Sequence, residues 1–156
     1  RLALAYRLPL VLHIVRAHAR AIEILREELR DASRGQHPEL YSGIVHSFSE
    51  EPSVAEAYLD LGLVLSISAA VITRGKGSAF EKLRQTMVTL SATAFVFETD
   101  SPDQPPAGEE GLNRPANLVK VAEAVARVRE VKFPETTAAT LLDRSAETLR
   151  RIFSIA

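Results

Sequence analysis

Two histidines and an acidic segment stand where apolar runs of the sequence end. These residues are His13, His46 and the triplet Glu98-Thr99-Asp100. A neutral imidazole is a common metal ligand, and a carboxylate suits hard or borderline cations. If the runs are neighbouring strands, the side chains of His13, His46 and Asp100 would converge on one edge of a sheet. Such a cluster could hold a divalent metal ion.

Each of these residues also has a purely structural interpretation. A single histidine at a strand end is more often structural than a metal ligand. An aspartate after a strand often caps a helix or forms a turn, and Pro102 makes a turn at Asp100 reasonable. We interpret His18, at a helix start, as structural and His37, in a polar loop, as a surface residue. The coincidence of three suitable residues at three run ends favours a site.

Four short apolar runs must position these residues. They cover 9–15, 42–47, 63–68 and 94–98, and they read as strands buried on both faces, which is typical of a parallel sheet. Strands that alternate with helices indicate βαβ units. In a barrel of such units the active site lies at the carboxyl ends of the strands. The pattern alone leaves half of a barrel and an open doubly wound sheet as alternatives.

Helical patterns fill the remaining chain. The sequence starts without Met inside a helical pattern at 2–6, from which we expect a truncation or an absent upstream region. Ser53 and Glu56 form a capping-box pair for the helix after the second run, and Pro134 suits the start of the last helix. The proline-rich segment 101–115 is interpreted as a site loop. Three apolar residues would clasp the sheet at the end: Leu149, Ile152 and Phe153.

Composition limits the class of protein. The 156 residues suit a single domain, 1–156, and are 46% hydrophobic and 25% charged, as in ordinary globular proteins. The absence of Cys excludes disulfides and thiolate metal sites. No apolar stretch approaches the ~20 residues of a membrane span, and no signal-peptide pattern opens the chain. The net charge of −1 neither favours nor excludes a nucleic-acid partner.

Several segments, in order along nearly the whole chain, resemble the motifs of one family. They are LHIVRAH (12–18), GIVHSFSE (43–50), LGLVLSIS (61–68), FETDSPDQPPAG (97–108), Asn113-Arg114-Pro115 and RRIF (150–153). By these segments the sequence resembles the C-terminal half of the TatD-related metal-dependent hydrolases. The Glu-Thr-Asp-Ser-Pro and His-Ser-Phe-Ser elements make the resemblance specific because they occur together and in the right order.

The resemblance implies a fold, a ligand set and an activity. The fold is a (β/α)8 TIM-type barrel of the metal-dependent hydrolase superfamily, of which this chain would hold strands 5–8 and the C-terminal helices. His13, His46 and Asp100 would bind Mg²⁺, Mn²⁺ or Zn²⁺, and Asp100 would also accept a proton from the attacking water. Arg16, which could equally be a surface cation, would hold a phosphate oxygen, and Glu98 would contact substrate. The reaction would be hydrolysis of phosphodiester bonds in DNA, of the 3′–5′ exonuclease type, by a cytoplasmic protein.

The sequence also departs from the family. A His-x-His pair and a metal-bridging glutamate, which the family places on its first and fourth strands, are not in this chain, and Glu50 replaces a family glycine. A barrel of this type takes roughly 250 residues. Three hypotheses stay open: a DNase, a non-catalytic half-barrel module or degenerate subunit, and an amide or lactone hydrolase. The expected partners include a phosphodiester substrate. A missing N-terminal half, a partner chain or a second copy is also expected, because an isolated half-barrel has open strand edges.

Overall fold

The computed structural model of the chain describes residues 1–32 and 41–154, and His37 lies outside the described residues. Four parallel strands form one sheet in the order β1-β2-β3-β4. The strands are β1 (Leu10–His13), β2 (Gly43–His46), β3 (Val64–Ile67) and β4 (Phe95–Phe97). Each strand lies inside one of the four predicted runs, so the prediction of a parallel sheet is confirmed.

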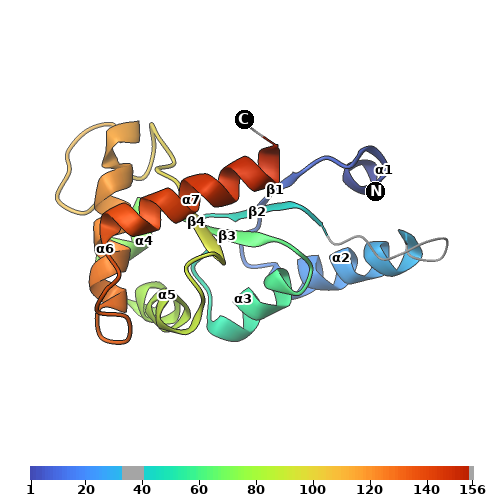
Figure 1. Cartoon of the computed structure of the whole chain (residues 1–156), viewed down its shortest axis with the longest axis horizontal. Coiled ribbons are helices and arrows are strands. Elements are labelled where there is room, and N and C mark those ends of the chain that lie inside the picture. Colours follow the sequence, from blue (N-terminus) through green and yellow to red (C-terminus); the bar gives the residue numbers. More distant parts are fainter. Residues whose placement is uncertain (33–40, 155–156) are drawn as a thin grey trace.

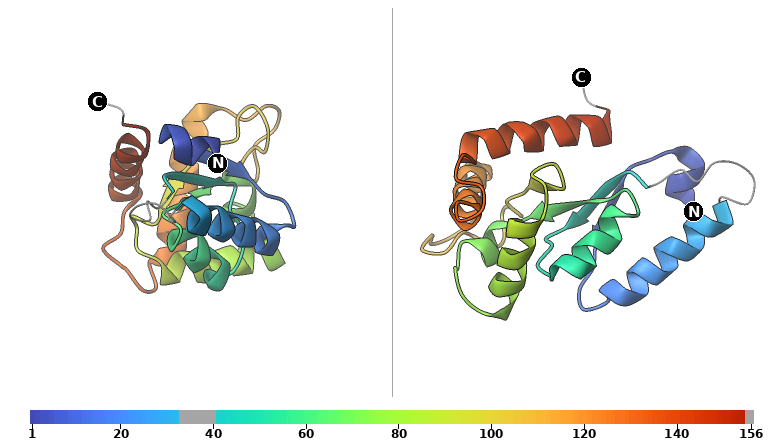
Figure 2. Two further views of the ribbon diagram at one scale, coloured as in Figure 1. Left: turned by 90° about the vertical axis from the view of Figure 1, so that its right-hand side faces the viewer. Right: turned by 60° about the horizontal axis from the view of Figure 1, so that its bottom comes forward.

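Helices connect the strands and cover the sheet on two sides. They are α1 (Leu2–Tyr6), α2 (His18–Ala32), α3 (Pro52–Leu59), α4 (Ala69–Ile72), α5 (Ser78–Thr89), α6 (Leu118–Arg129) and α7 (Ala138–Phe153), with a 3-10 turn η1 (Pro115–Asn117) before α6. Helices α2, α3 and α5 lie on one side of the sheet, and α7 runs across the other side (Figures 1 and 2). In residues 1–32 and 41–154, every helix is too short or too polar to span a bilayer.

The main hydrophobic core lies between the sheet and the layer of α2, α3, α5 and α6. Alternate residues of the inner strands point into it, because side chains along a strand alternate between the two faces. Its fully buried members include Val45, Leu65, Ile67, Phe95, Tyr58, Leu83 and Met87. Burial of each large apolar side chain contributes roughly 1.5–3 kcal/mol, so this layer fixes the strands that carry the strand-end polar groups.

Helix α7 covers the opposite face of the sheet through a smaller cluster. The cluster consists of Val64, Val96 and Ile152, with Ile44, Leu149 and Phe153 packed against it. The Oγ of Ser145 also accepts a hydrogen bond from the backbone N–H of Phe97 at 3.1 Å. Because the next N–H along β4, that of Glu98, donates to β3, the N–H of Phe97 points to the outer edge. The predicted clasp by Leu149, Ile152 and Phe153 is confirmed, and Ser145 of the same helix occupies the outward N–H of Phe97.

Strand β1 differs from the prediction that all four runs are buried on both faces. Burial alternates along β1, and Val11 is 59% exposed. Leu8 and Val15, on either side of the strand, are also exposed large hydrophobic residues. The reason is position, since β1 is the end strand and pairs only with β2 among the described strands. One face and one edge of β1 are therefore open.

The start of α3 differs from its prediction. The helix begins at Pro52, with Glu51 as its N-cap and without a side-chain cap hydrogen bond. The capping box predicted for Ser53 and Glu56 is therefore wrong. Proline has a fixed φ and no N–H to leave unsatisfied, so it favours the first helical position and moves the N-cap ahead of Ser53.

The start of α7 is set by threonine rather than by proline. Thr137 is the N-cap, and its side chain accepts a hydrogen bond from the backbone N–H of Thr140 while Thr140 Oγ1 accepts one from Thr137 N–H. Pro134, predicted to suit this helix start, lies in the preceding loop. A reciprocal cap satisfies two backbone donors at once, which explains why α7 begins at Ala138.

Candidate active site

Parallel pairing brings the two strand-end histidines side by side. The register of β1 and β2 pairs His13 with His46, and their ring centroids are 5.3 Å apart with the rings tilted by 40°. Ile44, two residues before His46, belongs to the α7 cluster. Because residues two apart on a strand share a face, the histidines lie on the α7 side of the sheet, beyond the carboxyl end of its apolar cluster.

Glu98 joins the ends of three strands. Its Oε2 lies 2.7 Å from Nδ1 of His46 and accepts a hydrogen bond from Ser66 Oγ. Its Oε1 accepts a hydrogen bond from the backbone N–H of Ser47 at 2.7 Å. With a proton on Nδ1 donated to the carboxylate, Nε2 of His46 is left as the nitrogen that can accept a proton or bind a metal ion.

Asp100 lies on the other side of the His46 ring. Its Oδ1 is 3.3 Å from Nε2 of His46, and its Oδ2 accepts a hydrogen bond from the side chain of Gln104. The backbone of Asp100 has a left-handed φ of 61°, a region that aspartate tolerates better than most residues. Its carbonyl oxygen accepts a bond from the N–H of Asp103 at 2.8 Å. Asp100 thus forms the turn expected from its sequence and also presents its carboxylate to His46.

The loop that carries Asp100 is held by Asn113, which is only 4% exposed. Its amide nitrogen donates to the carbonyl oxygens of Thr99, Asp103 and Gln104. Its Oδ1 accepts a hydrogen bond from the side chain of Asn117 at 2.9 Å. Because one buried side chain satisfies three carbonyl groups of the loop, the segment predicted as a site loop is fixed beside Asp100.

Arg16 and the His46 cluster make no contact with each other. Arg16 lies between β1 and α2, is exposed and has a left-handed φ of 54°. In the part of the chain that the structure describes, no acidic side chain forms an ion pair with its guanidinium. Its role in phosphate binding stays a prediction.

His18 is half-buried and packs against core side chains, in agreement with its structural interpretation. Its Nδ1 lies 3.0 Å from the hydroxyl of Tyr58, and its ring meets Phe48 and Tyr58 edge to face. Burial lowers the pKa of His18, against the opposing effect of Glu50. Burial also raises the pKa of Tyr58 to about 12. Glu50, which departs from the family glycine, accepts a hydrogen bond from Lys82.

The donor groups at the strand ends fit part of a metal site. A metal-binding histidine usually has its other nitrogen held by a carboxylate or carbonyl group, as Glu98 holds His46. Yet among residues 1–32 and 41–154, no three His, Cys, Asp or Glu side chains lie close enough together to hold a metal ion. Of the predicted ligands, His46 and Asp100 contact each other, and His13 contacts only the ring of His46. The described residues therefore supply an incomplete ligand set.

Comparison with known proteins gives the family. Residues 1–150 match the family described as TatD related DNase. The chain belongs to this family. It is 31% identical over 143 residues to the uncharacterized metal-dependent hydrolase YjjV of Escherichia coli K12, covering 90% of this chain and 50% of that protein. It is 29% identical over 159 residues to the 3′-5′ ssDNA/RNA exonuclease TatD of Erwinia tasmaniensis, covering 99% of this chain and 55% of that protein.

Solved structures of TatD proteins have the same fold. The crystal structure of the TatD homologue YjjV from E. coli has a TM-score of 0.79 and 25% identity, over 99% of this chain and 53% of that one. A TatD family hydrolase from Entamoeba histolytica has a TM-score of 0.73 at 14% identity, over 97% of this chain and 53% of that one. The chain spans about half the length of the curated TatD relatives it matches. The assignment of β1–β4 to strands 5–8 of a TatD barrel stays a prediction.

Sequence reasoning missed the residues that support His46 and Asp100. Ser66 is a polar residue in the apolar run 63–68, and the alternation of that strand could have placed it on the same face as Glu98. Asn113 was noted only as part of a family motif. Its contacts with the loop of Asp100 have no local sequence signal, because the partners precede it by 9 to 14 residues.

Proposed function

We propose that this chain carries part of the active site of a metal-dependent hydrolase of phosphodiester bonds, a DNase of the 3′–5′ exonuclease type in its intact form. One observation carries the proposal: His46 is held between Glu98 and Asp100, with His13 beside it, at the carboxyl ends of parallel strands. Membership of the TatD family supports the reaction class. The metal-dependent hydrolase and exonuclease names of the two relatives support the metal and the substrate.

The residues divide into ligands and supporting groups. His13, His46 and Asp100 are the proposed ligands of Mg²⁺, Mn²⁺ or Zn²⁺, which when bound would lower the pKa of a coordinated water toward ~7. Asp100 is proposed to accept the proton that such a water loses. The contacts of Glu98 fit a positioning role better than the expected contact with substrate, because both of its oxygens are engaged by His46, Ser47 and Ser66. Arg16 is proposed to hold a phosphate oxygen.

Further ligands must come from outside the described residues if the site binds metal in this way. We propose that they lie on strands 1–4 of a TatD-type barrel, on the missing half or a partner chain that continues the sheet from β1. The open edge of β1 and the exposed side chain of Val11 support this arrangement. The single domain at 1–156 and the cytoplasmic location expected from the sequence stay predictions.

The second candidate is a non-catalytic module that keeps the fold and does not turn over substrate. The incomplete ligand set of the described residues is the observation that favours it. The two candidates differ in what the native protein contains, because an active enzyme must supply further donors near His46.

The proposal is tested on the protein at its native length. We expect divalent-metal-dependent release of nucleotides from 3′-labelled single-stranded DNA. His46→Ala and Asp100→Ala should each lower kcat/KM by at least the ~100-fold that loss of a supporting group can cost, and should lower the bound metal measured by mass spectrometry. Asp60→Ala, at an exposed aspartate just after α3, is the matched control. A native protein with neither bound metal nor metal-dependent cleavage would establish the non-catalytic module.

A further inference from the structure

A cavity lies at the opposite end of the sheet from Glu98. Its volume is about 390 Å³, and it opens where the segment before β4, the end of α6 and the start of α7 meet. Its lining residues include Ser91, Arg129, Glu135, Thr136, Thr140 and Arg144. Because Ser91 precedes β4 while Glu98 follows it, the cavity is separated from the candidate active site by the length of that strand.

Arg129, on the wall of this cavity, is a buried cation, only 3% exposed. Its Nη1 donates to the carbonyl oxygens of Leu90, at 2.8 Å, and Met87. Its guanidinium lies 4.3 Å from the ring centroid of Phe133 and 5.4 Å from that of Phe95. These contacts fix the group in place, but carbonyl dipoles and aromatic rings do not neutralise a full positive charge.

The hydrogen-bonding capacity of Arg129 is also incompletely used. Its Nε is buried and has no hydrogen-bond partner within the described residues. No described Asp or Glu forms an ion pair with it. Buried charges in proteins are normally paired, so the charge of this guanidinium favours an anion in the adjacent cavity, although its Nε has almost no exposed surface there.

Other groups make the same cavity positive and rich in donors. Arg144, on the first turns of α7, adds a second guanidinium, and Glu135 is the one carboxylate among the lining residues. Burial lowers the pKa of Arg129 and Arg144 lowers it further, whereas Glu135 raises it. The amino end of the 16-residue helix α7 carries a partial positive charge of about half a unit. The hydroxyls of Thr136 and Thr140 lie at that helix end.

We propose that this cavity binds a phosphate group, either as free phosphate or on a small organic molecule. The hydroxyl of Thr140 donates to the carbonyl oxygen of Thr137, so two guanidinium groups, the hydroxyls of Ser91 and Thr136 and the positive end of a helix remain to attract a tetrahedral oxyanion. The volume falls within the roughly 300–1,000 Å³ of small-molecule sites, so there is room for a group attached to the phosphate. The site lies apart from His46 and does not depend on the hydrolase function.

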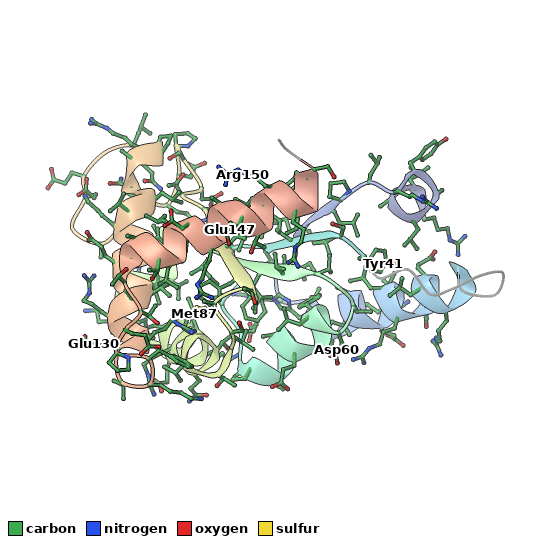
Figure 3. All side chains as sticks on the ribbon, in the orientation of Figure 1. Tyr41, Asp60, Met87, Glu130, Glu147 and Arg150 are labelled. Carbon is green, nitrogen blue, oxygen red and sulfur yellow. The ribbon has the colours of Figure 1, made fainter. Side chains whose placement is uncertain are left out.

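Two arginines of α7 allow binding in this cavity to be distinguished from general attraction of anions to the surface. Figure 3 labels two residues next to Arg129 at its lower left: Met87, whose carbonyl oxygen accepts a hydrogen bond from Arg129, and Glu130, which follows Arg129 in the chain. Arg150 is labelled away from them, on the part of α7 nearer its carboxyl end. Arg144 and Arg150 are both exposed arginines of α7, but only Arg144 lines the cavity. Arg150→Gln is therefore a matched control for Arg144→Gln.

The test is calorimetric titration of the native-length protein with inorganic phosphate and with ribose 5-phosphate, in phosphate-free buffer at constant ionic strength. We expect saturable binding that Arg144→Gln weakens at least tenfold and that Arg150→Gln and His46→Ala leave unchanged. Tighter binding of one probe shows whether the phosphate is free or carried on an organic group. Absence of saturable binding, equal affinity of Arg144→Gln and the unmodified protein, or loss of binding in His46→Ala would each overturn the proposal.

Discussion

Nδ1 of His46 lies 2.7 Å from Oε2 of Glu98, although 52 residues separate the two in the sequence. The contact crosses β3, whose Ser66 donates to the same carboxylate oxygen. One carboxylate therefore sets the orientation of an imidazole two strands away.

Replacing Glu98 with alanine should lower both stability and metal binding. The change removes the partner of His46, Ser47 and Ser66, and leaving buried polar groups unsatisfied costs about 1–3 kcal/mol. Urea unfolding should show a loss of this size, and metal affinity should fall by roughly 10–100-fold. Glu123→Ala, at an exposed glutamate of α6, should change neither quantity. Unchanged metal content in the Glu98→Ala variant would contradict the positioning role.

Replacing Asn113 with alanine should loosen the loop that presents Asp100. Three carbonyl groups lose their shared donor, so we expect a loss of about 1–3 kcal/mol in the free energy of unfolding. Limited proteolysis should cut the segment 101–112 faster than in the unmodified protein. Arg114→Ala, at the exposed next residue, serves as control. Equal rates of cutting would show that the loop is held by other contacts.

The open edge of β1 should make the isolated chain self-associate. Val11 is 59% exposed on this strand, and an exposed apolar edge strand is a template for pairing with another chain. Val11→Lys should shift the molar mass, measured by light scattering after size exclusion, toward that of the monomer. Val131→Lys changes a residue that is 93% exposed but lies outside the sheet, so it should have no such effect. A chain that is monomeric at every concentration would count against the prediction.

Stability should increase with pH below the ordinary histidine pKa of 6.5 because of His18. Burial lowers the pKa of His18 in the folded state, so the unfolded chain binds more protons than the folded chain in the window just below 6.5. Folding is then favoured as pH rises through this window, and the contribution is lost as pH falls. Urea unfolding from about pH 5 to pH 7 should show a slope of at most one proton. His18→Phe should reduce this slope, and an unchanged slope would refute the assignment.

The strands could be predicted from the sequence because each is a short run of apolar residues between helical patterns. The meeting of His13 and His46 followed from the same pattern, since the carboxyl ends of parallel strands lie on one edge. The exposed face of β1 could not be predicted in this way. An end strand and an inner strand have the same local composition, and only the neighbours differ.

The support around the candidate site was harder to predict. The role of Glu98 depends on side chains from two other strands, and that of Asn113 on carbonyl groups of a loop. The wrong capping box at Ser53 and Glu56 shows a related limit, because the pattern was present but the φ of Pro52 placed the helix start elsewhere. Contacts between distant segments and competition between neighbouring signals are not encoded in a single local motif.

The hydrogen bond from Phe97 to Ser145 has a consequence for assembly. Because Ser145 of α7 occupies the outward N–H of Phe97, a strand that pairs with β4 must displace this hydrogen bond, whereas no strand among the described residues covers the outer edge of β1. A second copy that paired there would bring its own β1 edge, and the contact would be isologous, with the same surface used by both copies. Association through the edge of β1 alone would then close at two copies.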